Sequence, residues 1–250
     1  MAINAQSGVG RIRLFEDFHS VQCPIALTTD FENLGDFYIG GEGIEDNSSG
    51  LATLDSDGLS GVGQMTSGAT DNDTVAIMTG IGFDVALMGT LVLETRTRFA
   101  DLDTKMAFIG FTSSADLDTQ MTDILDYSAA TTVTLTGATF CGFFLSSEFT
   151  DDEDWHMVYK GGTTTGATDT STIDADDDAV AGEFQVLRLE VDNNGTARYY
   201  IDGVLKQTTA GAISTTTDLA AYVGVAANSA AASVMDVDYV LVEANRDWNA

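Results

Sequence analysis

Positive charge is scarce in this sequence: its 250 residues include 10 Lys and Arg against 39 Asp and Glu, for a formal net charge of −29. A field of that sign repels phosphate backbones and anionic bilayers, so we expect no nucleic acid and no membrane among its partners. No stretch reaches the roughly 18 uninterrupted apolar residues of a membrane span. The N-terminus has no apolar segment followed by a small-residue cleavage site, so no secretory signal is predicted.

Proline, cysteine and histidine are nearly missing as well. Pro24 is the single proline, so the chain has to turn with its 25 glycines and with Asn and Asp. Cys23 and Cys141 are far apart in apolar surroundings, and without a secretory signal two buried thiols are favoured over a disulfide. His19 and His156 are the only histidines, which excludes a multi-histidine metal site. His156 lies in a strand-like segment and fits a packed strand residue better than a general base.

What the sequence does contain is Thr, Val, Gly and aromatic residues, with apolar side chains at every second position. This period of two is typical of β-strands. The predicted strands are residues 74–80, 91–100, 105–113, 139–147, 155–162, 183–192, 196–203, 204–209, 219–227 and 234–244. Helix is predicted only weakly, at residues 116–125. The predicted fold class is all-β, a two-sheet antiparallel β-sandwich of the jelly-roll type.

We expect one domain with a short extension at each end. Residues 1–35 are less regular and are predicted to form an N-terminal arm or edge segment. Residues 36–244 form the sandwich, and residues 245–250 form a C-terminal tail. Segments 151–154 and 163–182 are acidic, rich in small residues and without large apolar groups, so both are predicted as loops.

The order of the segments resembles a known family. The pieces that carry the resemblance are "FIGFT" at 108–112, the acidic turn before Trp155, "VDNNGTARYYIDG" at 191–203 and "DVDYVLVE" at 236–243. Together they resemble the concanavalin A-like lectin/glucanase jelly roll over about residues 50–244, in the version found in virion proteins of tailed bacteriophages. The resemblance implies the fold. It leaves the function open, because this sandwich occurs in lectins, glycosidases, adhesion modules and capsid decorations.

Glu190 and Asp192 are the candidate catalytic pair. Glycosidases of the family that the chain resembles carry Glu-x-Asp and a second Glu two or three residues later. One carboxylate attacks or activates water, and the other protonates the leaving oxygen. Here the chain continues with Asn-Asn-Gly in place of the second Glu. The favoured interpretation is an acidic strand face paired with Arg188 or Arg198 across a hairpin, so no catalytic residue is predicted.

Oxygen ligands for a hard cation such as Ca²⁺ cluster in four acidic segments, 55–58, 71–73, 101–103 and 174–178. None of them completes an EF-hand pattern, and a chain with 39 acids produces such clusters by chance. Solvated loops are therefore favoured over metal sites, although 174–178 has the highest charge density. No cofactor and no metal are predicted.

Carbohydrate binding without cleavage needs an aromatic platform beside Asp or Asn. For each strand aromatic, a core position is favoured over a sugar-binding one. These aromatics are Trp155, Tyr159, Tyr199, Tyr200 and Tyr222. Trp248, in the tail near Arg246, either anchors a partner surface or packs on its own domain, and the sequence favours neither.

From these observations we predict a non-enzymatic structural protein of a phage virion, a capsid decoration (cement) protein on the outer capsid surface. It would bind the major capsid protein and sister copies, and would oppose shell rupture by burying area across capsomer boundaries. A homo-oligomer is expected, with a trimer on three-fold positions as one arrangement. The alternative is a lectin-like, carbohydrate-binding module of a tail or host-recognition structure, and a glycosidase is a third, less favoured option.

Overall fold

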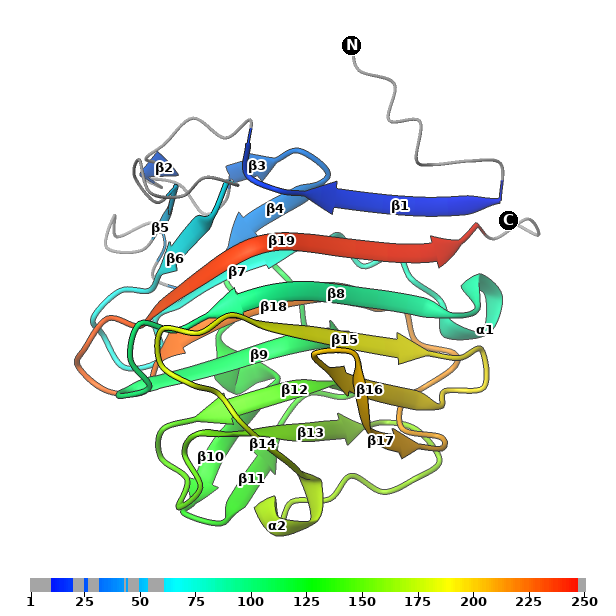
Figure 1. Cartoon of the computed structure of the whole chain (residues 1–250). Helices are drawn as coiled ribbons and strands as arrows, with labels where there is room; N and C mark the ends of the chain where they lie inside the picture. Colours follow the sequence, from blue (N-terminus) through cyan, green and yellow to red (C-terminus); the bar gives the residue numbers. More distant parts are fainter. Residues whose placement is uncertain are drawn as a thin grey trace.

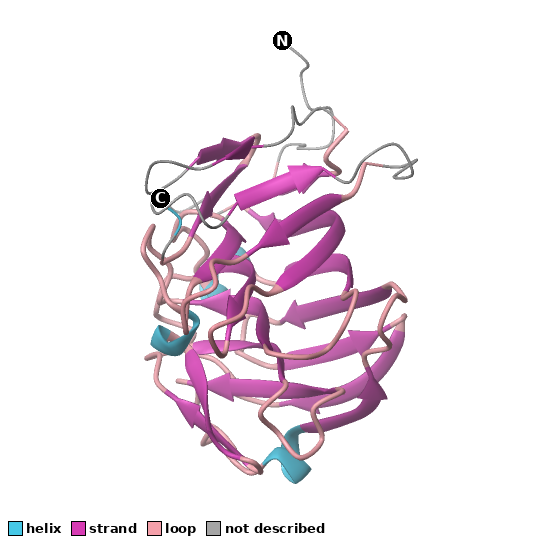
Figure 2. Ribbon diagram, turned by 90° about the vertical axis from the view of Figure 1, so that its left-hand side faces the viewer, coloured by secondary structure: helices cyan, strands magenta, loops and turns pink. Residues whose placement is uncertain are grey.

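The computed structural model describes residues 10–19, 25–26, 32–42, 44, 50–53 and 61–246. Within them the chain forms two large antiparallel sheets stacked face to face (Figures 1 and 2). The predicted fold class, a two-sheet antiparallel β-sandwich, is confirmed. Cys23, Trp248 and segment 55–58 lie outside the described residues.

One sheet has nine strands, in the order β17-β16-β15-β8-β19-β6-β5-β2, with β1 also paired to β19. The bounds of its strands are β1 (Arg11–Glu16), β2 (Ile25–Ala26), β5 (Gly50–Thr53), β6 (Gly63–Thr66), β8 (Leu91–Arg98), β15 (Gln185–Val191), β16 (Ala197–Ile201), β17 (Val204–Thr209) and β19 (Val234–Asn245).

The other sheet has eight strands, in the order β14-β13-β12-β9-β18-β7-β4-β3. Their bounds are β3 (Glu32–Leu34), β4 (Phe37–Gly40), β7 (Thr74–Met78), β9 (Lys105–Thr112), β12 (Phe140–Ser146), β13 (Asp154–Lys160), β14 (Asp174–Asp178) and β18 (Ala220–Ala227). A separate hairpin and three short helical turns complete the fold: β10 (Leu125–Ala129), β11 (Thr132–Leu135), α1 (Val85–Met88), η2 (Met121–Asp123) and α2 (Thr170–Ile173).

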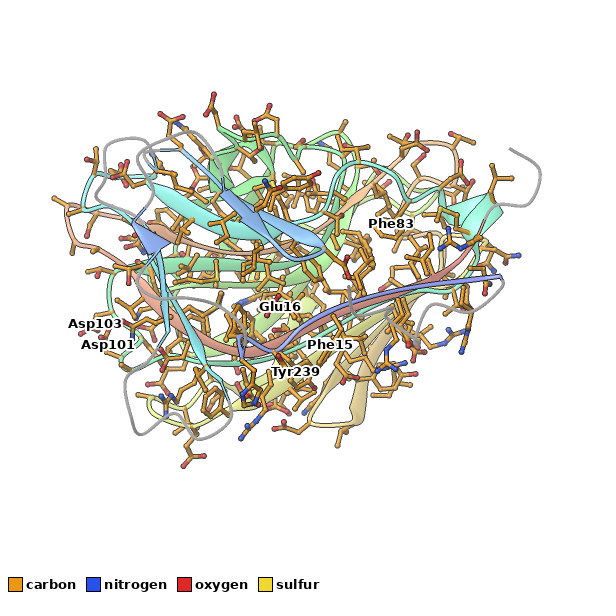
Figure 3. All side chains as sticks on the ribbon, turned by 90° about the horizontal axis from the view of Figure 1, so that it is seen from above. Phe15, Glu16, Phe83, Asp101, Asp103 and Tyr239 are labelled. Carbon is orange, nitrogen blue, oxygen red and sulfur yellow. The ribbon has the colours of Figure 1, made fainter. Side chains whose placement is uncertain are left out.

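Part of the predicted N-terminal segment is an edge strand. β1 pairs with β19 over six positions, from Arg11 opposite Asn245 to Glu16 opposite Val240. Figure 3 shows Phe15 of β1 beside Tyr239 of β19, with ring centroids 6.1 Å apart. The last strand of the domain is therefore flanked by the first one.

The predicted helix at 116–125 is wrong. Only the single turn η2 is helical there, and β10 begins at Leu125. The reason is local, because the Asp116 carboxylate accepts hydrogen bonds from the Asp118 N–H and the Thr119 hydroxyl. Such side-chain bonds to neighbouring positions compete with the helical pattern.

The predicted loop at 163–182 is also wrong in part, since it contains α2 and β14. β14 is the sequence "DADDD", which has low β-propensity. It forms a strand because it pairs with β13 at the edge of the eight-stranded sheet, while its own Ala175 and the preceding Ile173 are buried. Tertiary pairing overrides local preference here.

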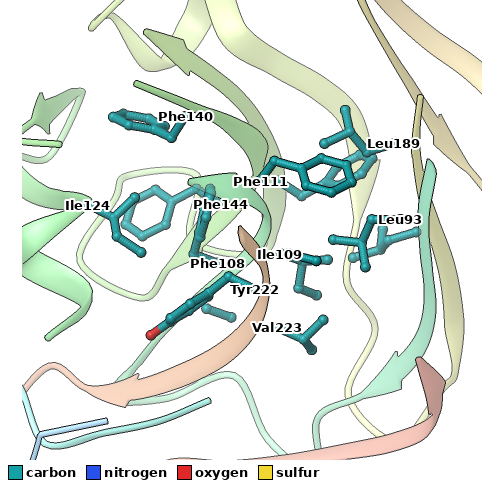
Figure 4. Close-up of a cluster of buried hydrophobic side chains, with 14 of the residues drawn as sticks. Leu93, Phe108, Ile109, Phe111, Ile124, Phe140, Phe144, Leu189, Tyr222 and Val223 are labelled. Atoms are coloured by element: carbon teal, nitrogen blue, oxygen red, sulfur yellow. The ribbon is translucent and has the colours of Figure 1, made fainter. Parts of the chain in front are cut away.

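The main core lies between the sheets, where the period-two side chains meet. Leu93 and Leu189 of the nine-stranded sheet face Ile109, Phe111 and Val223 of the eight-stranded sheet (Figure 4). All five are buried, as the alternation in segments 91–100 and 183–192 predicts.

A second apolar layer covers the outer face of the eight-stranded sheet. Phe108, Phe140, Phe144 and Tyr222 point to that side, opposite to Ile109 and Val223 (Figure 4). All four are fully buried, together with Ile124 after η2. Every residue of β9, β12 and β18 is consequently buried, whichever face it occupies.

Two glycines make this second layer fit. A Cβ on Gly142 would lie 2.7 Å from the Gly110 Cα and 2.8 Å from the Phe108 ring. The ring therefore packs directly on bare backbone where β9 and β12 run side by side. Larger residues at either position would lift it away.

Candidate functional site

The carboxylates of the candidate catalytic pair are occupied by arginines on the outer face of the nine-stranded sheet. Asp192 accepts a bidentate pair from Arg198, with Nη1 2.9 Å from Oδ1. Glu190 accepts from Nε and Nη2 of Arg188 at 2.8 and 2.7 Å. Arg188 also reaches Glu94, at 2.8 Å from Nη1 to Oε2. The predicted pairing across the hairpin is confirmed for Asp192 and Arg198, whereas Arg188 pairs with Glu190 along the same strand, β15.

This geometry is poor for acid–base catalysis. A glycosidase needs one carboxyl group with a raised pKa to protonate the leaving oxygen. The hydrogen bonds from Arg198 instead lower the pKa of Asp192. A pocket of about 330 Å³ adjoins Glu190, and Arg11, Arg188 and Glu243 also line it. Because acidic and basic side chains line that pocket together, it offers neither a free general acid nor a free general base.

The same face collects most of the positive charge. Six of the ten Lys and Arg residues lie on it: Arg11, Arg13, Arg96, Arg98, Arg188 and Arg198. Five of them form ion pairs with acids of that face, which are Glu94, Glu190, Asp192, Asp236, Asp238 and Glu243. Arg96 and Arg98 also lie over the Phe184 ring, 4.3 and 4.5 Å from its centroid. One face of an acidic protein is thus charge-balanced.

Four of the strand aromatics are core residues, as predicted. Trp155, Tyr159, Tyr199 and Tyr222 are buried, and the Trp155 Nε1–H donates to Gln185 Oε1 at 3.0 Å across the sandwich. The remaining one, Tyr200, is half-buried on the charge-balanced face. Trp155, Tyr159 and Tyr199 lie between the sheets and Tyr222 lies in the second apolar layer, so none of these four forms an exposed platform.

The sequence interpretation missed a different aromatic position. Tyr127 of β10 is half-buried and lines a pocket of about 300 Å³ at one end of the eight-stranded sheet. The other lining residues are mostly acids and amides: Asp71, Asn72, Met106, Asp126, Glu148 and Asn228. Burial raises the pKa of Asp126, and the charge of Asp71 raises it further. We call this the Tyr127 pocket.

No local signal identifies this pocket, since its residues come from five separate segments. Segment 71–73, considered for Ca²⁺, contributes Asp71 and Asn72. Asp126 and Tyr127 directly follow the segment that was predicted to be helical. The pairing of β7, β9 and β18 brings Asp71, Asn72, Met106 and Asn228 together, and Glu148 follows β12, which pairs with β9. Asp126 and Tyr127 come from the separate β10–β11 hairpin.

Three acids gather at the edge of the eight-stranded sheet, and we call them the β13–β14 acid cluster. Asp151 precedes β13, Asp154 begins it and Asp174 begins β14; one carboxylate oxygen from each lies within 4.8 Å of the others. In the described part of the chain no other three His, Cys, Asp or Glu residues gather this closely. Asp154 is buried, and burial followed by the neighbouring carboxylates of Asp178, Asp174 and Asp151 raises its pKa to about 8.

Segment 101–103, another Ca²⁺ candidate, has a structural partner instead. Asp101 and Asp103 lie at the rim of the sandwich (Figure 3). The fully buried Lys105 donates from Nζ to the Asp101 carboxylate at 2.8 Å and also to the Asp101 carbonyl. This acid therefore neutralises a buried lysine.

His156 lies beside the acid cluster and is fully buried. It follows Asp154 by two positions on the same face of β13 and is paired with Asp174 of the neighbouring strand β14. Its ring packs against Phe149 at 4.8 Å between centroids, and burial lowers its pKa. The prediction of a packed strand residue is confirmed. His19, the other histidine, follows β1 and is exposed.

Cys141 carries a free thiol and is fully buried in β12. Burial raises the pKa of this thiol, so it is inert as a nucleophile.

Comparisons with known proteins find similarity in structure alone. No family model and no curated protein matches the sequence. Among solved structures, a protein of unknown function from Shewanella oneidensis MR-1 is 13% identical, with 97% of this chain and 90% of that chain covered and a TM-score of 0.57. Peanut lectin is 10% identical (94% and 98% covered, TM-score 0.54), and a Bacillus licheniformis β-glucanase is 14% identical (95% and 99%, TM-score 0.53).

The chain has a concanavalin A-like fold. Identities of 10–14% establish this fold and nothing finer. Among the described helices, none has the length and apolar character that crossing a membrane requires.

Proposed function

We propose that the protein is a non-enzymatic structural protein of a phage virion, a decoration protein on the outer capsid surface. Its partners would be the major capsid protein and sister copies. The virion assignment depends on the sequence resemblance over residues 50–244. The proposal of a non-enzymatic role depends on the two outer faces of the sandwich.

The observation that carries the proposal is that neither described sheet face offers a catalytic cleft. A polysaccharide-cleaving site needs an open groove with a free acid and a free base. The outer face of the eight-stranded sheet is filled by the layer that contains Phe108, Phe144 and Tyr222. On the other sheet, Glu190 and Asp192 are bound by arginines. A sandwich with these two outer faces suits binding to neighbouring capsid proteins better than cleavage of a polysaccharide.

Contact with sister copies has a candidate surface in β17, the last strand of the nine-stranded sheet. Val204 is 58% exposed and Leu205 is 49% exposed on this edge strand. Exposed apolar residues on an unpaired sheet edge favour association with another chain. We propose that this edge contributes to the area buried between copies.

The experiment is densitometry of purified particles, with this band measured against the major capsid band. A decoration protein is expected at hundreds of copies per particle and is expected to remain through a mild wash. A few copies, located at the tail, would contradict the proposal. For the edge, Leu205→Asp should weaken binding to stripped particles at least about tenfold. The matched control is Leu87→Asp, because Leu87 is 52% exposed in α1, away from β17.

A second candidate function, carbohydrate binding, is favoured by the Tyr127 pocket. An aromatic ring beside several carboxylate and amide groups is a typical arrangement for a sugar site. Peanut lectin, by its name a lectin, shares the fold, which supports the comparison as an analogy only.

A glycan array separates the two functions. Retention of one glycan class by the wild type, its loss in Tyr127→Ala and its preservation in Tyr200→Ala would establish the pocket as a sugar site. Tyr200 is a suitable control because it is a half-buried tyrosine on the opposite sheet. Retention that is equal in both variants, or absent from the wild type, would exclude this pocket as a sugar site.

A further inference from the structure

We infer that the charge-balanced face of the nine-stranded sheet is the surface through which two copies of this chain associate, face to face, as a two-fold dimer. The arginines and acids of this face lie on or directly beside strands β1, β8, β15, β16 and β19. A two-fold contact differs from the three-fold arrangement considered from the sequence. The inference is independent of the virion and carbohydrate proposals, because it concerns the isolated chain.

The type of cation on this face points to a protein partner. The chain has seven arginines and three lysines, and six of the arginines lie on this face. The lysines belong to other strands: Lys105 to β9, Lys160 to β13 and Lys206 to β17. Arginine is favoured over lysine in protein interfaces, because its planar guanidinium forms bidentate bonds and is weakly hydrated. A face that only balanced charge would accept lysine equally well.

Aromatic rings lie among these arginines. Phe15 and Tyr239 pack against each other at 6.1 Å between ring centroids (Figure 3), and Arg96 and Arg98 lie over the Phe184 ring. All three rings are half-buried, so part of each remains accessible to a partner. Arginine beside partly exposed aromatic rings is the composition of interface hot spots.

The strand register mixes the two signs of charge across the face. Neighbouring strands carry opposite charges at paired positions: Arg13 with Glu243, Glu190 with Arg198, Arg188 with Glu94 and Arg98 with Asp236. No block of one sign is formed, so the face can lie against a copy of itself. Arg11 is exposed and has no ion pair in the described part of the chain, which leaves its guanidinium available to an acid of the second copy.

The exposed apolar edge extends this face. β17 is the neighbour of β16 in the sheet, and Leu205 of β17 is paired with Tyr200 of β16. Directly opposed residues of antiparallel strands point to the same side of a sheet, so Leu205 lies on the side of the charge-balanced face. With 49% of Leu205 exposed, a second copy on this face would also cover apolar surface at its margin.

The charge of the whole chain selects a second copy as the occupant. Outside this face 33 acids accompany four cations, so two copies that met through any other surface would set acids against acids. Such like-charge contacts disfavour association, whereas a neutral face against itself carries no such penalty. The charge-balanced face is therefore the described surface on which two copies of this acidic chain can meet.

The face is large enough for a specific contact. Five strands about 4.8 Å apart span about 24 Å, and the eight residues of β8 span about 26 Å. The footprint is roughly 600 Å² per copy, or about 1,200 Å² for the pair, which is the lower end of specific interfaces. A polar contact of this size predicts a Kd on the order of micromolar.

Sedimentation velocity of the full chain tests the inference, at about 1–200 µM and in about 0.15 M NaCl, where the Debye length is only about 8 Å. We expect a reversible monomer–dimer equilibrium. Arg96→Glu reverses a charge on β8, the middle strand of the face, and should raise the dimer Kd at least about tenfold. Lys160→Glu is the matched control, because it changes the net charge equally but lies at the end of β13 in the other sheet, so the dimer should persist.

Three results would overturn the inference. The first is a wild-type chain that is monomeric or trimeric throughout this range. The second is an equal dimer Kd for Arg96→Glu and Lys160→Glu, which would mean that the face is not the contact. The third is a dimer that Leu205→Asp abolishes and Arg96→Glu leaves intact, which would place the contact on the β17 edge alone. If Arg96→Glu does not fold, as judged by circular dichroism, Arg11→Glu decides, because Arg11 is exposed.

Discussion

At the scale of single residues, what a position does depends on what touches it more than on its type. Glu190 and Asp192 match part of a catalytic motif, yet each is bound by an arginine. Asp154, which belongs to no catalytic motif, is the acid with a pKa raised to about 8. The sequence predicts the arginine partners of Glu190 and Asp192, but the burial that sets Asp154 apart follows from strand pairing.

The Arg198–Asp192 pair gives a pH dependence with a defined sign. The pKa of Asp192 is lower in the folded state than in the unfolded state. Its contribution is therefore fully present above the unfolded pKa of about 4, and it disappears as the pH falls through the folded pKa. Arg198→Met should cost about 0.5–1 kcal/mol at pH 7, because the pair is partly exposed. The cost should shrink below pH 4.

Urea unfolding at pH 7 and pH 3 measures this difference. Lys206→Met is the comparison, since it removes a cation from the neighbouring strand β17 but leaves Asp192 paired. A cost for Arg198→Met that is the same at both pH values would mean that packing of the arginine stem, and not the ion pair, stabilises the sheet.

Gly142 tests the second apolar layer. Its Cβ would lie 2.4 Å from the Ile109 carbonyl oxygen and 2.8 Å from the Phe108 ring. Overpacking of this kind costs typically about 1–3 kcal/mol, so Gly142→Ala should lower the free energy of unfolding by about that amount. Gly80→Ala is the control, because its Cβ would meet nothing within 4 Å. Urea denaturation that gives equal stabilities for the two variants would contradict the packing described here.

At the scale of elements, the strands with an alternating pattern could be predicted, including the edge strand β17, and the edge strand β14 could not. Segments such as 91–100 alternate between a buried and a charged face, and this pattern alone assigns them. β14 has no such pattern and forms through its pairing with β13. The Tyr127 pocket escaped prediction for a related reason: its residues are distant in sequence, and the register of several strands brings them together.

A substitution at Ile173 tests whether segment 163–182, predicted as a loop, contributes to the stability of the folded state. This side chain is fully buried where α2 meets β14. Ile173→Ala should therefore cost about 2–5 kcal/mol, as for a core position. Val180→Ala should cost less than about 0.5 kcal/mol, since Val180 is 48% exposed beyond β14. Thermal or urea unfolding compares the two, and a small effect at Ile173 would mean that this segment contributes little to the folded state.

At the scale of the whole molecule, charge is distributed very unevenly. The charge-balanced face uses six of the ten cations, so the rest of the chain has four cations for 33 acids. Salt acts on these two regions in opposite directions. It screens the ion pairs of the charge-balanced face, which are worth about 0–1 kcal/mol each, and it also screens the repulsion among the acids that outnumber the cations elsewhere.

Repulsion should dominate, because outside the charge-balanced face 33 acids face four cations and the excess negative charge acts over the whole surface. Raising NaCl from 0.02 to 1 M shortens the Debye length from roughly 20 to 3 Å, so the midpoint of thermal unfolding should rise. Calorimetry in EDTA measures this without a contribution from divalent cations. Sucrose at matched osmolality is the control for solvent exclusion, and sodium sulfate is avoided because it strengthens apolar burial. A midpoint that falls with NaCl would mean that the ion pairs of the balanced face contribute more to stability than the acidic surface costs.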